Sequence, residues 1–151
     1  MLPLVGWREW VTLPGLGIGR IKAKVDTGAR SSSLDALDVR IVRVGRHRDV
    51  HFSVPYDREG ETHVVACASR LIDERWVTSS DGRREFRPVI QTEISLHGAV
   101  WLIEVTLTSR AVMGFRMLLG REALRSRFLV DPGRSFLAER RTQRLRKVSS
   151  P

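Results

Sequence analysis

Apolar and polar residues alternate along most of this chain, in short runs that turn residues separate. Between residues 18 and 25 the basic side chains of Arg20, Lys22 and Lys24 alternate with apolar residues. A period of two predicts a β-strand with one buried face. Further β-prone runs span 5–13 and 39–44, and turn sequences occur at Pro14-Gly15, Gly45, 57–60, Asp81-Gly82 and His97-Gly98. This spacing predicts an all-β domain, either a barrel or a sandwich.

Two longer stretches are predicted to form β-hairpins. Residues 76–90 turn at Asp81-Gly82 and have a polar outer part, which we expect to project into solvent. Residues 94–107 turn at His97-Gly98, and their apolar character predicts a buried hairpin. One segment, residues 120–127, favours a helix because good helix formers follow Gly120.

The composition is typical of a folded, soluble protein. Of the 151 residues 42% are hydrophobic, and no apolar run approaches the roughly 20 residues that cross a membrane as a helix. The single cysteine, Cys67, excludes an internal disulfide, and its two alanine neighbours predict a small buried residue. The N-terminus lacks the apolar core of a signal peptide. We therefore expect a cytoplasmic protein that makes no contact with membranes.

The net charge of +9 is concentrated at the C-terminus. Residues 134–151 carry six basic residues against Glu139 alone. We expect residues 139–151 to form a basic, solvated tail after a folded domain at 1–138. A tail that binds RNA, the ribosome or another acidic partner is the alternative. The rest of the chain shows no motif of a nucleic-acid-binding domain, so a nucleic-acid partner is not expected.

The sequence Val25-Asp26-Thr27-Gly28-Ala29 stands out at the end of an apolar strand. It places a carboxylate on a tight loop, where Gly28 lets backbone amides approach the side chain of Asp26. The hydroxyl of Thr27 can bond a neighbouring backbone group and stiffen the loop. A strand-end turn that Asp26 merely caps is the simpler interpretation.

Three features in order resemble a retropepsin, the viral type of aspartic protease. Asp26-Thr27-Gly28 resembles the active-site signature, the polar hairpin around Gly82 occupies the place of the flap, and 117–121 resembles the apolar-Gly-Arg element before the single helix. Residues 4–138 resemble more closely a bacterial and archaeal group of retropepsin-like proteins. Members are often encoded beside, or fused to, ATP-grasp glutamate ligases, and they are widely labelled ATP-dependent zinc proteases. The resemblance is carried by residues 5–9, 21–30, 87–90, 115–121 and 130–132.

This resemblance implies an all-β, retropepsin-like (acid protease) closed β-barrel with one short C-terminal helix. It implies an aspartic endopeptidase whose catalytic residues are Asp26, Thr27 and Gly28. Such an enzyme needs two carboxylates that share a proton, and this chain contains one Asp-Thr-Gly. The resemblance therefore implies a C2 homodimer in which two Asp26 side chains meet at the two-fold axis.

The same resemblance implies a substrate-binding set, in which one residue departs from the viral pattern. Retropepsins usually have Asp or Asn after Asp-Thr-Gly-Ala, whereas this chain has Arg30. A guanidinium there is suited to acidic peptides, such as glutamate tails that a ligase has added. An ion pair of Arg30 with Asp35 or Asp38 is an equally good interpretation. The full set is Ala29, Arg30, Ser79, Ser80, Asp81, Gly82, Arg83 and Arg84.

Neither metal nor ATP is expected as a cofactor. The chain has no His-Glu-x-x-His motif, and its four histidines lie singly on strand or turn segments. The Gly-Lys-Ser/Thr ending of a phosphate-binding loop is also absent.

The chain is longer than a minimal retropepsin between Asp26 and the predicted flap. The additional residues, 39–72, are predicted to form an added hairpin. The main alternative to an enzyme is a non-catalytic peptide-binding or adaptor protein partnered with a glutamate ligase or the ribosome.

Overall fold

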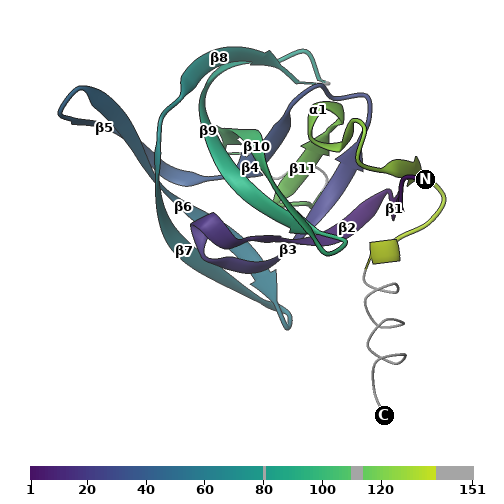
Figure 1. The fold of residues 1–151 in the computed structure, drawn as a ribbon. Coiled ribbons are helices and arrows are strands. Elements are labelled where there is room, and N and C mark those ends of the chain that lie inside the picture. The colour runs from purple at the N-terminus through teal and green to yellow at the C-terminus, as the bar shows by residue number, and fades with distance from the viewer. Residues whose placement is uncertain (80, 110–113, 139–151) are drawn as a thin grey trace.

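The computed structural model describes residues 1–79, 81–109 and 114–138, and nearly all of its regular structure is β-strand (Figure 1). This confirms the predicted all-β class. The basic tail predicted at 139–151 lies outside the described residues. The elements are β1 (Leu4–Gly6), β2 (Arg8–Leu13), a 3-10 turn η1 (Pro14–Leu16), β3 (Ile18–Asp26), β4 (Ser32–Asp35), β5 (Leu37–Val44), β6 (His47–Arg58), β7 (Glu61–Arg70), β8 (Asp73–Thr78), β9 (Arg84–Leu96), β10 (Ala99–Thr108), β11 (Met117–Gly120), α1 (Arg121–Leu124) and β12 (Leu129–Asp131).

The main sheet has seven strands in the order β10-β4-β11-β3-β2-β9-β8. β9 also pairs antiparallel with β10, so the pairings that start at β10 return to it. β11 pairs in parallel with β3 and antiparallel with β4, which places the carboxyl ends of β3 and β11 side by side. β1 and β12 form a separate parallel pair of three residues each.

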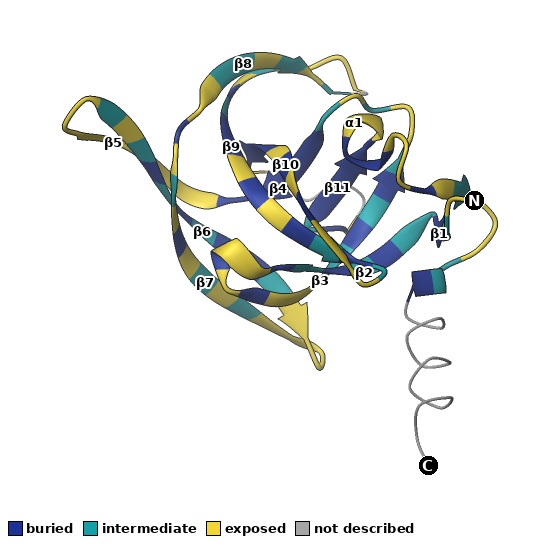
Figure 2. Cartoon of the chain, in the orientation of Figure 1, coloured by how far each residue is buried: buried dark blue, intermediate teal, exposed yellow. Residues whose placement is uncertain are grey.

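The hydrophobic core is formed by the inward-facing residues of these strands, coloured dark blue in Figure 2. β3 shows the predicted alternation, because Ile21, Ala23 and Val25 are buried while Lys22 and Lys24 are half-buried. Cys67 is buried as predicted, and burial raises the pKa of its thiol. Among the described residues, no helix is long and apolar enough to cross a membrane.

The predicted hairpin at 76–90 is confirmed as β8 and β9, which pair from Asp73↔Val89 to Thr78↔Arg84. The hairpin at 94–107 is confirmed as β9 and β10, joined at His97 and Gly98, which both have left-handed backbone angles. The prediction that this second hairpin is buried was wrong for one of its faces. Val100 and Leu102 point away from the core and are more than half exposed.

Three other predictions needed correction. The strand predicted at 5–13 is two strands separated at Trp7, whose backbone N–H bonds to the carbonyl of Arg134 instead. The added segment is not a hairpin but a three-stranded sheet, β5-β6-β7. It packs on the core through β6, while every residue of β5 is exposed and the β5 end reaches away from the fold (Figure 1).

The predicted helix at 120–127 is also shorter, since α1 ends at Leu124. The backbone leaves the helical region at Arg125, and Ser126 has a positive φ of 64°. This reversal returns Phe128 to the core, where its ring lies 5.6 Å from that of Trp101. Burial of a large aromatic side chain outweighs the modest helix propensity of these residues.

Candidate active site

Asp26 is the last residue of β3, a strand with hydrogen-bonded neighbours on both sides. β2 pairs with one edge of β3, and β11 pairs with the other edge up to Gly120↔Asp26. Val25 is buried, and its backbone N–H donates a 2.8 Å hydrogen bond to the carbonyl of Trp7. The carboxylate of Asp26 is therefore carried by a rigid strand, and it is half-buried where that strand ends.

A tight turn follows Asp26 and bonds to its carboxylate. The N–H of Gly28 donates a 3.0 Å hydrogen bond to Asp26 Oδ1, and the N–H of Ala29 donates a 3.2 Å bond to the carbonyl of Asp26. A Cβ at residue 28 would lie 3.2 Å from Asp26 Oδ1, so a side chain there would crowd the carboxylate. The turn therefore forms the contact that both interpretations of this loop predict, a backbone amide bonded to the Asp26 carboxylate. Thr27 is exposed.

The chain after this turn is held against the start of α1. The N–H groups of Arg121 and Glu122 donate to the carbonyls of Ala29 and Arg30, at 2.8 and 3.2 Å. The guanidinium of Arg121 donates a 3.2 Å hydrogen bond to the carbonyl of Gly28. The apolar-Gly-Arg element and the Asp-Thr-Gly loop, about ninety residues apart in sequence, thus form one hydrogen-bonded unit.

Arg30 forms an ion pair, but not with either predicted partner. Its Nε lies 2.8 Å from Glu122 Oε1, and this hydrogen bond lowers the pKa of the Glu122 carboxyl. Asp35 pairs instead with Arg116, with 2.9 Å between Oδ2 and Nη1. The expected ion pair with Asp35 or Asp38 is therefore wrong, because the loop turns Arg30 toward α1.

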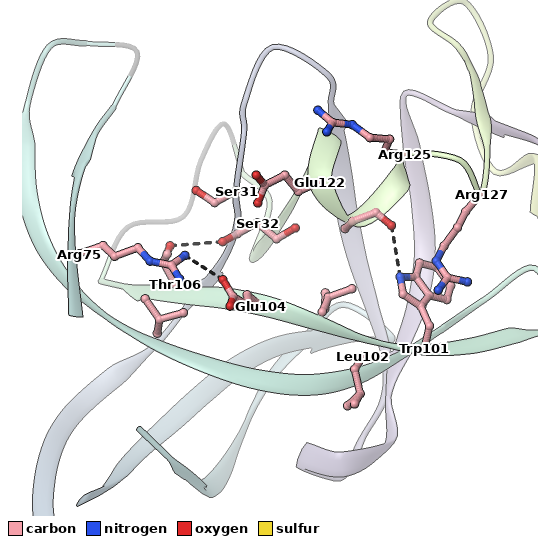
Figure 3. A pocket seen from close by; sticks show the side chains of 13 residues that line it. Ser31, Ser32, Arg75, Trp101, Leu102, Glu104, Thr106, Glu122, Arg125 and Arg127 are labelled. Carbon is pink, nitrogen blue, oxygen red and sulfur yellow. Dashed lines mark hydrogen bonds and ion pairs between the residues drawn. The ribbon is translucent and has the colours of Figure 1, made fainter. Parts of the chain in front are cut away.

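Asp26 opens onto a cleft of about 930 Å³ between its own loop and strand β8. Five of the predicted site residues line this cleft, namely Asp26, Gly28, Ala29, Arg30 and Ser79. A second cavity of about 360 Å³ adjoins it, and Figure 3 shows its lining, with Arg75 directed at Glu104 and Trp101 at the far end. The two cavities share Ser31, Arg75, Glu104 and Glu122.

The remaining predicted site residues lie elsewhere. In the turn between β8 and β9, Gly82 has a left-handed backbone and Ser79 donates a hydrogen bond to the carboxylate of Asp81. Arg83 lies 4.0 Å from Asp81, and the guanidinium of Arg84 stacks 4.7 Å from the ring of Trp76. The structure does not bring Thr27, Asp81, Gly82, Arg83 or Arg84 to the cleft lining, and Ser80 lies outside the described residues.

Several cleft residues were missed from the sequence. They are Lys24, Ser31, Ser33, Arg75, Trp76, Val77, Thr78, Arg87, Glu104, Leu118 and Glu122. Arg75, Arg87 and Glu104 come from three neighbouring strands, β8, β9 and β10. The sequence of a single segment does not show with which other strand it pairs. Glu104 interrupts an otherwise apolar run, which was the available signal for that residue, whereas Arg87 follows a polar stretch and does not stand out.

Two of the histidines, His47 and His97, make separate local contacts. His47 Nε2 lies 3.2 Å from Asp49 Oδ1, and His97 Nε2 lies 3.0 Å from the carbonyl oxygen of Leu4. In the described part of the chain, no group of three or more His, Cys, Asp or Glu residues could hold a metal ion.

The chain is similar to known proteins along most of its length. Residues 4–141 match a family model, RimB-like, described as retropepsin-like aspartic endopeptidase RimB. Two curated relatives are each named probable alpha-L-glutamate ligase. The protein from Shewanella pealeana is 42% identical over 133 residues, and the protein from Parasynechococcus marenigrum is 40% identical over 149 residues.

These matches cover 88% and 98% of this chain but only 29% and 32% of the two relatives. The chain therefore spans about a third or less of their length. A solved structure is similar along nearly its whole length. It is a Legionella pneumophila protein of unknown function, with a TM-score of 0.73 and 27% identity, covering 90% of this chain and 98% of that one.

Proposed function

The chain belongs to the RimB-like family of retropepsin-like aspartic endopeptidases, and we propose that it hydrolyses peptide bonds through two Asp26 carboxylates that meet in a homodimer. The observation that carries this proposal is the geometry of Asp26. One of its carboxylate oxygens accepts the Gly28 amide. In the described part of the chain, its other oxygen, Oδ2, has no hydrogen-bond partner and is left for a second carboxylate.

A single carboxylate cannot serve as base and acid at once. In aspartic proteolysis an ionised carboxylate takes a proton from water, while a protonated carboxyl donates a hydrogen bond to the scissile carbonyl. The water oxygen then attacks the carbonyl carbon, and the amine leaves with a proton. One chain supplies half of this arrangement, so the proposed enzyme is a C2 dimer whose pKa values belong to the pair.

Strand β8 supports an extended peptide as substrate. It is an edge strand of the main sheet, and its residues Arg75 to Thr78, together with Ser79 directly after it, line the cleft consecutively. An edge strand offers unpaired backbone N–H and C=O groups that an added peptide strand can bond. We therefore propose that substrate lies along β8, with its scissile bond next to Asp26. The proposed framework is the retropepsin barrel, which the circuit of pairings between β10 and β9 supports.

The proposed substrates are acidic peptides, including glutamate-tailed proteins. Arg30 is on the cleft lining, and its ion pair with Glu122 is exposed enough for an incoming carboxylate to compete for the guanidinium. The relatives named probable alpha-L-glutamate ligase favour the same class of substrate. We propose that the enzyme works in the cytoplasm, with an ATP-grasp glutamate ligase as its functional partner.

The second candidate is a non-catalytic adaptor that binds acidic peptides in the same cleft. It is favoured by the presence of one carboxylate per chain at the end of β3, which is sufficient for binding but not for hydrolysis. Only a dimer that brings two copies of Asp26 together gives the enzyme.

Asp26→Asn separates the two candidates. We expect it to abolish cleavage of peptides and glutamate-tailed proteins while the protein still folds and dimerises, as measured by sedimentation. Asp38→Asn is the matched control, because Asp38 is exposed on β5 and asparagine tolerates its left-handed φ of 53°. Wild-type protein that is dimeric but cleaves none of a broad peptide library between pH 4 and 8 would favour the adaptor.

A further inference from the structure

Two guanidinium groups lie opposite each other on one wall of the Asp26 cleft. Arg75 of β8 and Arg87 of β9 are directly paired in the antiparallel ladder, so their side chains leave the same face of the sheet. Both line the cleft. Like charges at directly opposed positions destabilise a β-sheet. The arrangement therefore needs compensation from other charges or from a ligand.

Arg75 is compensated within the protein. Its Nε donates a 2.7 Å hydrogen bond to Asp73. Its Nη1 donates a 2.8 Å bond to Glu104, which Figure 3 shows. These two bonds raise the pKa of Arg75, and the bond from Arg75 is the main cause that lowers the pKa of Asp73. The charge of Arg75 is thus shared between two carboxylates at short distances.

Arg87 is compensated less well, although it is more deeply placed. Its side chain is 9% exposed, and the neighbouring inward position on β9, Val89, is fully buried. Its Nε lies 3.3 Å from Glu85 Oε2, and its Nη1 lies 3.4 Å from Thr106 Oγ1. Charge-assisted hydrogen bonds of this type are usually about 2.7–2.9 Å long. A guanidinium has five N–H donors, so Arg87 retains the capacity to bind an anion.

The other arginines and the glutamates on the cleft lining are paired with one another. Glu104 is bonded to Arg75, and Glu122 is bonded to Arg30. Arg30 itself is 76% exposed, so water screens its charge. A carboxylate that enters the cleft is held more strongly by a buried guanidinium than by an exposed one, because the interaction is less screened.

We propose that Arg87 is the specificity-determining residue of this cleft, and that it binds the side-chain carboxylate of a glutamate or aspartate in the bound peptide. The inference rests on the proposed function and names the group that selects its substrates. It assigns selection mainly to the cleft wall formed by β9, rather than to Arg30 or to the arginines of the β8–β9 turn. Ser33, also on the cleft lining, supplies a hydroxyl beside the same space.

The test measures peptide binding separately from cleavage. Its probes are short fluorescent peptides with one glutamate in an otherwise uncharged sequence, the glutamate moved through successive positions, each with a matched glutamine peptide. In an Asp26→Asn background, we expect the best glutamate peptide to bind roughly tenfold or more tightly than its glutamine match. Arg87→Gln should bring that ratio close to one, and Arg87→Lys should retain part of it. Arg43→Gln removes the same charge from exposed β5 and should leave the ratio unchanged.

Thermal unfolding of each variant controls for misfolding. Arg87→Glu reverses the charge and gives a change in peptide preference that a purely structural role of Arg87 would not produce. That variant should prefer a lysine peptide to its glutamine match. A glutamate preference that survives in Arg87→Gln, or a wild-type cleft that binds glutamate and glutamine peptides equally, overturns the assignment. If no peptide binds, the assignment and the proposed function both fail. If glutamate peptides bind through Arg87 but protein with Asp26 intact cleaves none, only the proposed catalysis fails.

Discussion

Arg30 and Glu122 form a 2.8 Å ion pair that joins the loop after Asp26 to the first turn of α1. The hydrogen bond from Arg30 lowers the pKa of Glu122. A carboxyl group whose pKa is lowered by folding stabilises the native state above its unfolded pKa, near 4.3, and loses that contribution as the pH falls through its folded pKa. The pair therefore links the stability of the loop after Asp26 to pH at the acidic end.

Glu122→Gln tests this link. Because both side chains are largely exposed, we expect a loss of only about 0.2–1 kcal/mol in the free energy of unfolding at neutral pH. The difference from wild type should shrink as the pH falls below about 4, where the wild-type carboxyl becomes protonated. Denaturant unfolding at several pH values, in low and high salt, measures it. A difference that does not change with pH would contradict the ion-pair explanation.

Glu9 is a fully buried carboxylate that holds the C-terminal segment of the described fold. Its Oε2 accepts the N–H groups of Gly6 and Leu137 at 2.6 and 2.9 Å, and its Oε1 accepts that of Ala138 at 3.2 Å. In Glu9→Gln the amide NH₂ must face at least one of these donors. We expect a loss of about 1–3 kcal/mol in the free energy of unfolding.

The matched control for Glu9 is Glu93→Gln, because Glu93 is exposed on β9. It should change the unfolding free energy by less than about 0.5 kcal/mol. Hydrogen exchange at the amides of Leu137 and Ala138 gives a local readout, and we expect faster exchange in Glu9→Gln. Unchanged exchange at both amides would show that the carboxylate does not hold this segment.

Features that depend only on residues close together in the sequence were predictable. The alternation in 18–25 gave the strand, and the Asp26-Thr27-Gly28 turn needs only its own residues to form the Gly28 hydrogen bond. Helix α1 was overestimated because its end depends on the burial of Phe128 against Trp101, a contact made across the fold.

Features that depend on the pairing of strands were not predictable. Arg75 and Arg87 oppose each other because of the β8–β9 register, and Arg30 meets Glu122 because β3 and β11 end together. The sequence analysis singled out Arg30 and placed Arg83 and Arg84 with it in one predicted substrate-binding set. Their different surroundings arise only when the strands associate.

Arg116 compensates the charge of buried Asp35, whose side chain is 4% exposed. The hydrogen bond to Asp35 is the main cause that raises the pKa of Arg116. Arg116→Met would leave a buried carboxylate without its cation, and we expect a loss of about 3–5 kcal/mol in the free energy of unfolding. Adding Asp35→Asn to that variant should recover part of the loss, since it removes the uncompensated charge. A double variant no more stable than Arg116→Met alone would contradict this account.

Gly120 lies beside Asp26 in the ladder between β11 and β3, and its lack of a side chain lets the loop at Arg30 and Ser31 approach. A Cβ at residue 120 would lie 2.5 Å from the carbonyl oxygen of Ser31 and 2.8 Å from that of Arg30. These are backbone atoms, so Gly120→Ala must displace the loop, at a cost of about 1–3 kcal/mol in unfolding free energy. Gly19→Ala is the control, because a Cβ there meets no atom within 4 Å, and it should be neutral or slightly stabilising. If hydrolysis depends on the position of Asp26, Gly120→Ala should reduce kcat more than its loss of stability explains, whereas equal kcat in the two folded variants would show that the loop tolerates displacement.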